Sequence, residues 1–144
     1  MADDLKKIRI KNNEAGWTLM ELIVVLVILG MLAAVVGPKV YEKIIDSKAQ
    51  IAKIQLGELE GALQMYSFDV GRFPTTAEGL GALVRNPSGA ESWRGPYLKK
   101  EQVPNDPWER AYGYKSPGDH GDFDLYSFGA DGIEGTDDDV CSWK

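Results

Sequence analysis

The chain has 144 residues and a formal net charge of −6, which suits one modest globular domain plus one membrane-length segment. No basic patch with interleaved aromatic residues occurs, and binding to nucleic-acid phosphates requires clustered Lys and Arg, so nucleic acid is not an expected partner. The sequence also has no Ser/His/Asp set, no Cys/His pairing at useful spacing and no metal-hydrolase motif, and therefore does not support an enzyme.

Residues 1–16 form a basic-leaning leader. Its four basic residues exceed its three acidic residues by one, so the remainder carries a charge of −7. The leader ends at Gly16, an aromatic residue (Trp17) follows, and Glu21 lies five positions after the glycine. This motif resembles the class III signal of type IV pilins and type II secretion pseudopilins, in which the aromatic residue is usually Phe. The resemblance implies cleavage between Gly16 and Trp17 by a prepilin peptidase, and N-methylation of Trp17.

Residues 17–37 are predicted to form a membrane-spanning helix. As a helix these residues would be roughly 31 Å long, which matches a hydrocarbon core of about 30 Å. A secretory signal peptide is the alternative, with Ala33 and Ala34 before Gly37 as a possible cleavage site. Against this alternative, the apolar stretch continues directly into more helix-compatible sequence.

Glu21 is the one carboxylate at the head of this apolar stretch. A charge at mid-membrane costs about 2.5 to 3.5 kcal/mol, and less near a helix end. If the chain is cut before Trp17, Glu21 lies one turn into the new helix and favours both the free amine and the positive end of the helix dipole. The resemblance implies that Glu21 pairs with the amine of a neighbouring subunit during assembly. The simpler alternative is an interfacial residue that reaches the lipid headgroups.

A long helix is expected to continue from Lys39 to about Phe68 and to end at Gly71 and Pro74. Pro38 predicts a kink or local melting, with a simple curved helix as the alternative. One face carries apolar residues at helical spacing and should pack on something: Ala52, Leu56, Leu59, Leu63 and Tyr66. Gly57 and Gly61 weaken the helix, and either permit close approach by another element or are merely tolerated.

The remaining sequence predicts short elements. Thr75 and Glu78 have the spacing of a capping box, which predicts a short helix to about Val84. Strand-like runs occupy residues 111–115 and 122–128, and the segment between them has turn chemistry. His120 in that turn is interpreted as a solvated loop residue. The single cysteine, Cys141, excludes an intrachain disulfide; we interpret it as a small residue near the end of the sequence, with intermolecular pairing as the alternative.

Residues 131–139 contain five carboxylates and two glycines. Such crowding is unfavourable unless the charges are solvated or share a cation, and calcium accepts six to eight oxygen ligands in irregular geometry. From composition alone, a solvated acidic turn and a calcium loop both remain open.

Several further segments are similar to the major pseudopilin family of type II secretion: residues 72–80, 95–98, 106–108 and 127–132. The resemblance implies an α+β, type IV pilin-like fold, in which a long N-terminal helix packs on a small antiparallel sheet with a C-terminal calcium loop. It implies calcium as the cofactor, with side-chain ligands from Asp131, Asp138 and Asp139 and carbonyl ligands from Phe128 and Thr136. Which of the adjacent aspartates bind is left open by Asp137.

The implied organisation is a cleaved leader at 1–16, a transmembrane and filament-core helix at 17–37, and a periplasmic head domain at 38–144. The implied function is that of a single-pass inner-membrane protein that polymerises into a helical periplasmic pseudopilus and drives export of folded proteins. Its partners would be other copies of the chain, prepilin peptidase, minor pseudopilins and the inner-membrane assembly platform. A surface-pilus subunit is the related alternative, and a membrane-tethered calcium-binding module is a third hypothesis, under which Glu21→Ala would be harmless.

Overall fold

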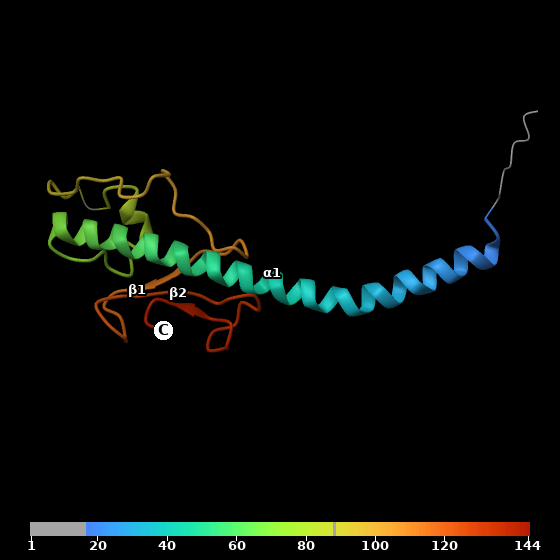
Figure 1. The fold of residues 1–144 in the computed structure, drawn as a ribbon. Helices are drawn as coiled ribbons and strands as arrows, with labels where there is room; N and C mark the ends of the chain where they lie inside the picture. Colours follow the sequence, from blue (N-terminus) through green and yellow to red (C-terminus); the bar gives the residue numbers. More distant parts are fainter. Residues whose placement is uncertain (1–16, 88) are drawn as a thin grey trace, which may run out of the picture. The chain divides into compact units, whose positions relative to one another are not determined.

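The computed structural model describes residues 17–87 and 89–144, which contain one long helix, a short 3-10 helix and three strands. Helix α1 spans Leu19–Val70, the 3-10 turn η1 spans Leu80–Leu83, and the strands are β1 (Gly113–Lys115), β2 (Asp124–Ser127) and β3 (Val140–Cys141) (Figure 1). The chain divides into two compact units, one ending at Val40 and the other spanning Tyr41–Lys144. The second unit, called the head below, holds all three strands.

Helix α1 begins and ends where the sequence predicts. Its C-terminus is closed by Gly71, whose positive φ of 82° is a conformation that glycine adopts easily and whose amide donates to the carbonyl of Ser67. The helix runs through Pro38 without interruption, so the predicted local melting is wrong. Pro38 has no amide to donate, so one helical hydrogen bond is lost there, but the helix continues past it.

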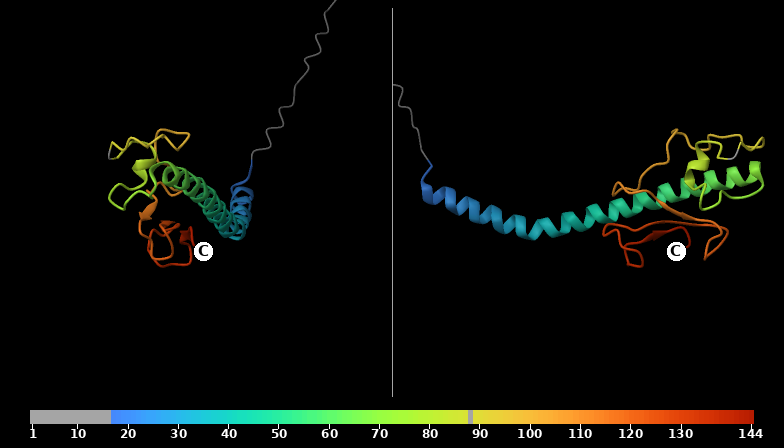
Figure 2. Two further views of the ribbon diagram at one scale, coloured as in Figure 1. Left: turned by 90° about the vertical axis from the view of Figure 1, so that its left-hand side faces the viewer. Right: turned by 180° about the vertical axis from the view of Figure 1, so that it is seen from behind.

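The head core forms between the predicted face of α1 and the sheet. All five predicted face residues are buried, and Ala62 joins them. All of these residues except Ala52 belong to one cluster with side chains from η1 and the sheet region, including Leu83, Tyr112 and Leu125. In both views of Figure 2 the orange and red strand segments lie beside the part of α1 that belongs to the head. The apolar period of the sequence therefore marks the face that carries the core.

The sheet is antiparallel, with the order β1-β2-β3. Strands β1 and β2 fall inside the two predicted runs but are shorter. Tyr126 stands opposite Gly113, and a side chain at Gly113 would overlap the Tyr126 ring. Strand β3 was not expected from the sequence, because two residues are too few to show alternation. It places Cys141 in the buried part of the head as a free thiol.

Two local predictions need correction. The expected helix from Thr75 to about Val84 is a turn followed by the four-residue η1. The glycines at 57 and 61 do not accommodate a neighbouring element within this chain, since a β-carbon at either would meet no atom within 4 Å. In the described monomer these two glycines are tolerated rather than required.

Candidate functional site

The first candidate site is the start of α1. Thr18 caps this helix: its hydroxyl accepts a hydrogen bond from the Glu21 amide at 3.2 Å, and its carbonyl accepts one from Leu22. Trp17, immediately before the cap, is 70% exposed, and Glu21 is also exposed. Gly16, the other half of the predicted cleavage site, lies outside the described residues. The local structure thus keeps Trp17 and Glu21 accessible at the start of the helix.

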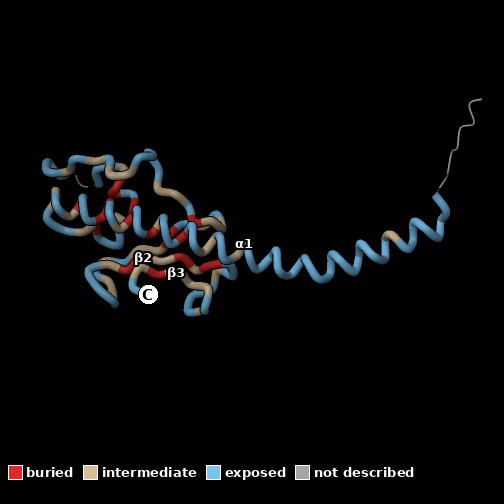
Figure 3. Tube along the Cα trace, in the orientation of Figure 1, coloured by how far each residue is buried: buried red, intermediate tan, exposed pale blue. Residues whose placement is uncertain are grey.

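The surface that follows is apolar and almost entirely unburied. Figure 3 shows it as a nearly continuous pale-blue stretch of helix. The helix is long and apolar enough to cross a membrane, and an 18-residue window of it has a mean hydropathy of 2.9 with none of that window buried. Soluble chains rarely expose such a contiguous apolar surface, so it must be covered by lipid or by other protein.

The second candidate site is the acidic loop, residues 128–139, which connects β2 to β3. Three glycines in it have positive φ: Gly129, Gly132 and Gly135. The amide of Gly132 donates to the carbonyl of Phe128 at 3.0 Å, which closes a tight turn directly after β2. A side chain at Gly129 would overlap Asp138, so the turn packs closely against the second arm of the loop, which leads into β3. Gly129 therefore allows the two arms of the loop to approach each other.

Asp138 is the central carboxylate of this loop. Its Oδ2 accepts hydrogen bonds from the amides of Ala130 and Asp131, at 2.5 and 3.0 Å, and its Oδ1 accepts one from the Thr136 hydroxyl at 2.5 Å. These bonds, led by that from Thr136, outweigh burial and lower the pKa of Asp138 below its ordinary value. Asp138 is therefore held as an anion that joins both arms of the loop.

Asp139 carries the observation most relevant to a metal. Its Oδ2 accepts a hydrogen bond from the Gly135 amide at 2.7 Å, but its Oδ1 is buried without a hydrogen-bond partner among the described residues. A buried carboxylate oxygen without a partner is unfavourable, and a bound cation would relieve it.

Asp131, the third predicted side-chain ligand, is exposed, and its Oδ1 accepts from the Ile133 amide at 2.8 Å. The two extra acids, Glu134 and Asp137, are also exposed. Within residues 17–87 and 89–144, no three His, Cys, Asp or Glu side chains converge as a ready-made metal cluster. The donor set, which is carboxylates together with backbone carbonyls, nevertheless has the chemistry of a hard-cation site and fits calcium.

Sequence reasoning missed the residues that brace this loop from outside. Asp106 is only 4% exposed; its Oδ1 accepts from the amides of Trp108 and Arg110, and its Oδ2 accepts from the Ser127 hydroxyl at 2.5 Å. The Nη2 of Arg110 in turn donates to the carbonyl of Gly129. In the sequence, Asp106 belongs to the segment 106–108 that is similar to the pseudopilin family, and nothing in that segment indicates that it contacts Ser127.

His120 is more than a solvated loop residue. Its ring stacks on Trp143, with centroids 4.2 Å apart, and its Nδ1 lies 3.0 Å from Oδ2 of the buried Asp124. Burial alone would raise the pKa of Asp124, but hydrogen bonds from His120 and from the amides of Asp119 and His120 lower it below its ordinary value. This contact fixes residues near the C-terminus to the β1–β2 connection.

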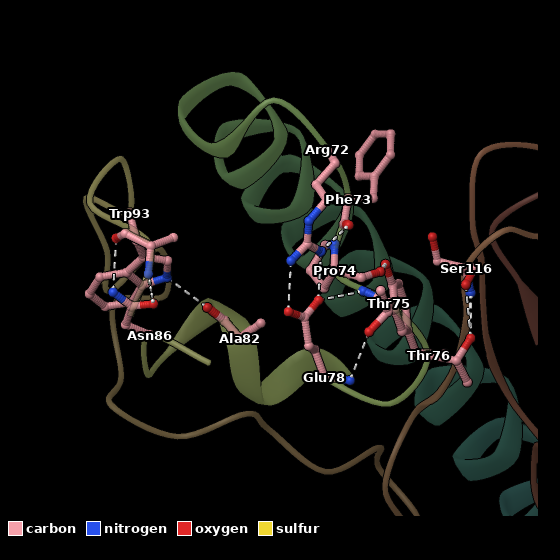
Figure 4. Close-up of polar contacts among 12 residues, drawn as sticks. Arg72, Phe73, Pro74, Thr75, Thr76, Glu78, Ala82, Asn86, Trp93 and Ser116 are labelled. Atoms are coloured by element: carbon pink, nitrogen blue, oxygen red, sulfur yellow. Dashed lines mark hydrogen bonds and ion pairs between the residues drawn. The ribbon is translucent and has the colours of Figure 1, made fainter. Parts of the chain in front are cut away.

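The predicted capping box is confirmed, and it forms part of a larger clamp (Figure 4). The Thr75 amide donates to Glu78 at 2.7 Å, and the Glu78 amide donates to the Thr75 hydroxyl at 3.2 Å. Arg72 adds two hydrogen bonds to the Glu78 carboxylate, at 2.6 and 2.8 Å, and lowers its pKa to about 2. The clamp ties the end of α1 to the segment before η1.

Comparisons with known proteins agree on one family. Residues 39–143 match the family model "Type II secretion system (T2SS), protein G", and residues 11–37 match the "Prokaryotic N-terminal methylation motif". The chain is 44% identical to the type II secretion system core protein G of Pseudomonas aeruginosa, over 92% of this chain and 97% of that protein. It is 42% identical to the protein of the same name from Vibrio cholerae, over 97% of both chains.

The fold is also shared with a solved relative. The crystal structure of the major pseudopilin from the type 2 secretion system of enterohaemorrhagic Escherichia coli matches with a TM-score of 0.63 and 35% sequence identity. The match covers 71% of this chain and 87% of that chain. The exposed apolar helix, the small antiparallel sheet and the matching sequence motifs all agree with this likeness. The chain therefore belongs to the type II secretion system protein G family of pseudopilins.

Proposed function

We propose that the chain is made as a single-pass precursor in the bacterial inner membrane and matures into the repeating subunit of a periplasmic pseudopilus. Prepilin peptidase removes residues 1–16 and methylates the new amine of Trp17. Mature copies then leave the membrane and assemble helically, with their apolar helices inside the filament and their heads outside. The growing filament drives folded proteins through the outer membrane. The role is structural, and no residue of this chain is assigned a catalytic function.

The observation that carries this proposal is the exposed apolar first part of α1, most of which lies within the residues that match the N-terminal methylation motif, 11–37. Lipid covers that surface in the precursor, and neighbouring helices cover it in a filament. Because both environments are apolar, transfer between them involves little exposure of apolar surface to water. The relatives' names and the solved pseudopilin support the secretion assignment over a surface pilus.

Glu21 gives the assembly its register. In the precursor membrane its charge is unfavourable, since the side chain has no partner shown within the described residues. In a filament the carboxylate of one subunit pairs with the Trp17 amine of another, and the pairing removes the penalty for both charges. Because only the correct register of neighbouring subunits brings Glu21 to this amine, the pairing favours that register over others. Filament growth also requires minor pseudopilins and an inner-membrane assembly platform.

Glu21→Gln tests the assembly proposal, because glutamine keeps the shape and helix propensity of glutamate and removes only its charge. Filaments in sheared-cell preparations and secreted enzyme in the medium should both be lost, while the protein remains in the membrane fraction. Glu58→Gln, at an exposed position of the same helix, is the matched control and should assemble normally. Normal filaments and normal secretion in Glu21→Gln would refute the pairing proposed for Glu21.

The acidic loop is proposed to bind calcium through Asp131, Asp138 and Asp139, with the carbonyls of Phe128 and Thr136 as further ligands. The buried, unpartnered Oδ1 of Asp139 supports this proposal. A bound ion would supply electrostatic attraction that holds the crowded carboxylates together. It would also fix the loop to the sheet in a chain whose single cysteine excludes an intrachain disulfide.

A thermal melt of the full chain in detergent, with calcium and then with chelator, tests the metal. Calcium at about 1,000 times its Kd should add roughly 4 kcal/mol to the free energy of unfolding. Asp139→Asn should lose most of this gain, whereas Asp137→Asn, an equal change of charge at an exposed residue, should keep it. An equal calcium response in all three proteins would remove Asp139 from the site, and no response in the wild type would remove calcium.

A further inference from the structure

We propose that Arg110 is a positioning residue for the acidic loop, and that it holds the loop in its cation-binding conformation before a cation arrives. This inference rests on the calcium proposal above for its binding readout. It concerns a residue outside the loop, on the turn between Asn105 and Ala111, which form an isolated β-bridge. The contacts of its guanidinium group, rather than its charge alone, carry the inference.

The backbone of Arg110 is itself rigidly placed. Its amide donates to Oδ1 of Asp106 at 2.8 Å, and its carbonyl accepts from the Asp106 amide at 2.7 Å. Asp106 is buried and also bonded to the hydroxyl of Ser127, the last residue of β2. Through Asp106, hydrogen bonds connect the backbone of Arg110 to the end of β2, where the acidic loop begins.

The guanidinium group lies against the turn at residues 128–132. Its Nη2 donates to the carbonyl of Gly129, and its Nη1 lies so close to Gly132 that a methyl group there would overlap it. Gly129 and Gly132 both have positive φ, of 59° and 72°. The turn therefore packs against the guanidinium group, and a side chain at position 132 would displace that group.

Asp138 binds the same peptide group from the other end. The carbonyl of Gly129 and the amide of Ala130 belong to one planar peptide unit, in which the two groups point in opposite directions. Arg110 binds the carbonyl, and the Asp138 carboxylate binds the amide at 2.5 Å. A cation and an anion thus fix the orientation of this peptide unit, one residue before Asp131.

Two effects of Arg110 on a bound cation oppose each other. Its positive charge repels the ion, so removing the charge alone would strengthen binding. Its hydrogen bond orders the turn that carries Phe128 and Asp131, so removing the bond would weaken binding. Groups that orient metal ligands from outside typically change affinity by about 10–100-fold. The sign of the measured change therefore distinguishes positioning from simple repulsion.

The test compares Arg110→Lys and Arg110→Met with the wild-type full chain in detergent, using calcium titration by calorimetry. Lysine keeps the charge and loses the planar fork, whereas methionine loses both. We expect both variants to bind calcium at least about tenfold more weakly. Arg94→Met, which removes an equal charge from an exposed loop residue, is the matched control and should bind as the wild type does. Unchanged or tighter binding in Arg110→Met would overturn the proposal.

A second measurement is independent of calcium. In chelator, hydrogen exchange at the amides of Ala130, Asp131 and Gly132 should be faster in both Arg110 variants than in the wild type and in Arg94→Met. Equal exchange rates in all four proteins would overturn the positioning role. If the wild type binds no calcium but exchange still depends on Arg110, the metal proposal fails while the placement of the turn by Arg110 stands.

Discussion

Helix α1 contains two apolar regions that differ in burial. Between Leu19 and Val40 every large apolar side chain except Val25 is exposed, whereas in the head one face of the helix, which includes Leu59 and Leu63, is buried. Both regions are helical. The difference shows that the first region depends on lipid or other subunits for its cover, while the second is completed by the chain's own sheet.

Leu63→Ala and Leu29→Ala apply the same substitution to these two regions. Leu63 is 0% exposed, so its truncation should lower the free energy of unfolding of the head by about 2–5 kcal/mol. The Leu29 side chain is 54% exposed, so Leu29→Ala should leave the free energy of unfolding of the head unchanged. Chemical denaturation in detergent, followed through the head's tryptophan fluorescence, measures both. If both substitutions lowered the free energy of unfolding equally, the two regions would unfold as one cooperative unit.

A smaller effect is expected at the clamp between Arg72 and Glu78. Glu78→Gln should lower the free energy of unfolding by roughly 1 to 2 kcal/mol. A larger loss is not expected, because the Arg72 side chain is 44% exposed and water screens the ion pair. The pKa of Glu78 is lowered from 4.5 to about 2, so its ionised form stabilises the fold above about pH 4.5. That stability is lost as the pH falls from 4.5 towards 2.

Thermal melts of the wild type and Glu78→Gln between pH 7 and pH 2 check this prediction. The difference between the two proteins should be largest at neutral pH and should shrink across the window from 4.5 to 2. Thr76→Ala is a neighbouring control, since its hydroxyl bonds to Ser116 and has no charge to titrate. A difference that does not vary with pH would show that the carboxylate charge is not responsible.

The smallest predicted effect is a gain in stability at Gly61. A β-carbon there meets no atom within 4 Å, so Gly61→Ala should stabilise the head by about 0.5–1 kcal/mol through helix propensity. Gly71→Ala is the contrasting variant and should destabilise, because its φ is 82°. If Gly61→Ala melts higher but fails to form filaments, that helix face contacts a neighbouring subunit.

Much of this molecule follows from local sequence. The extent of α1, its buried face, the capping box of Thr75 and Glu78, and the central strand pair are each encoded by a short periodic or capping pattern. The start of α1 is equally local, since Thr18 caps the helix that carries Glu21. Such features depend on residues within a few positions of one another, and a sequence displays them directly.

Other features depended on contacts between distant segments. Strand β3 exists because Ser127 and Tyr126 offer it a partner, not because two residues prefer a strand. The distinction between Asp137, which is exposed, and Asp138, which bonds both arms of the loop, cannot be made from three consecutive aspartates. His120 likewise acquires its role only when Trp143 is brought beside it.

The sequence by itself therefore determined the family, the long helix and the acidic composition of the loop. Tertiary structure alone decided which carboxylates of that loop accept hydrogen bonds from its backbone, and placed Arg110 against its first turn. The physical reason is range: helix periodicity and capping act over about one to four residues. The loop and the strand end before it are held by hydrogen bonds to Asp106 and from Arg110, about twenty residues earlier in the chain.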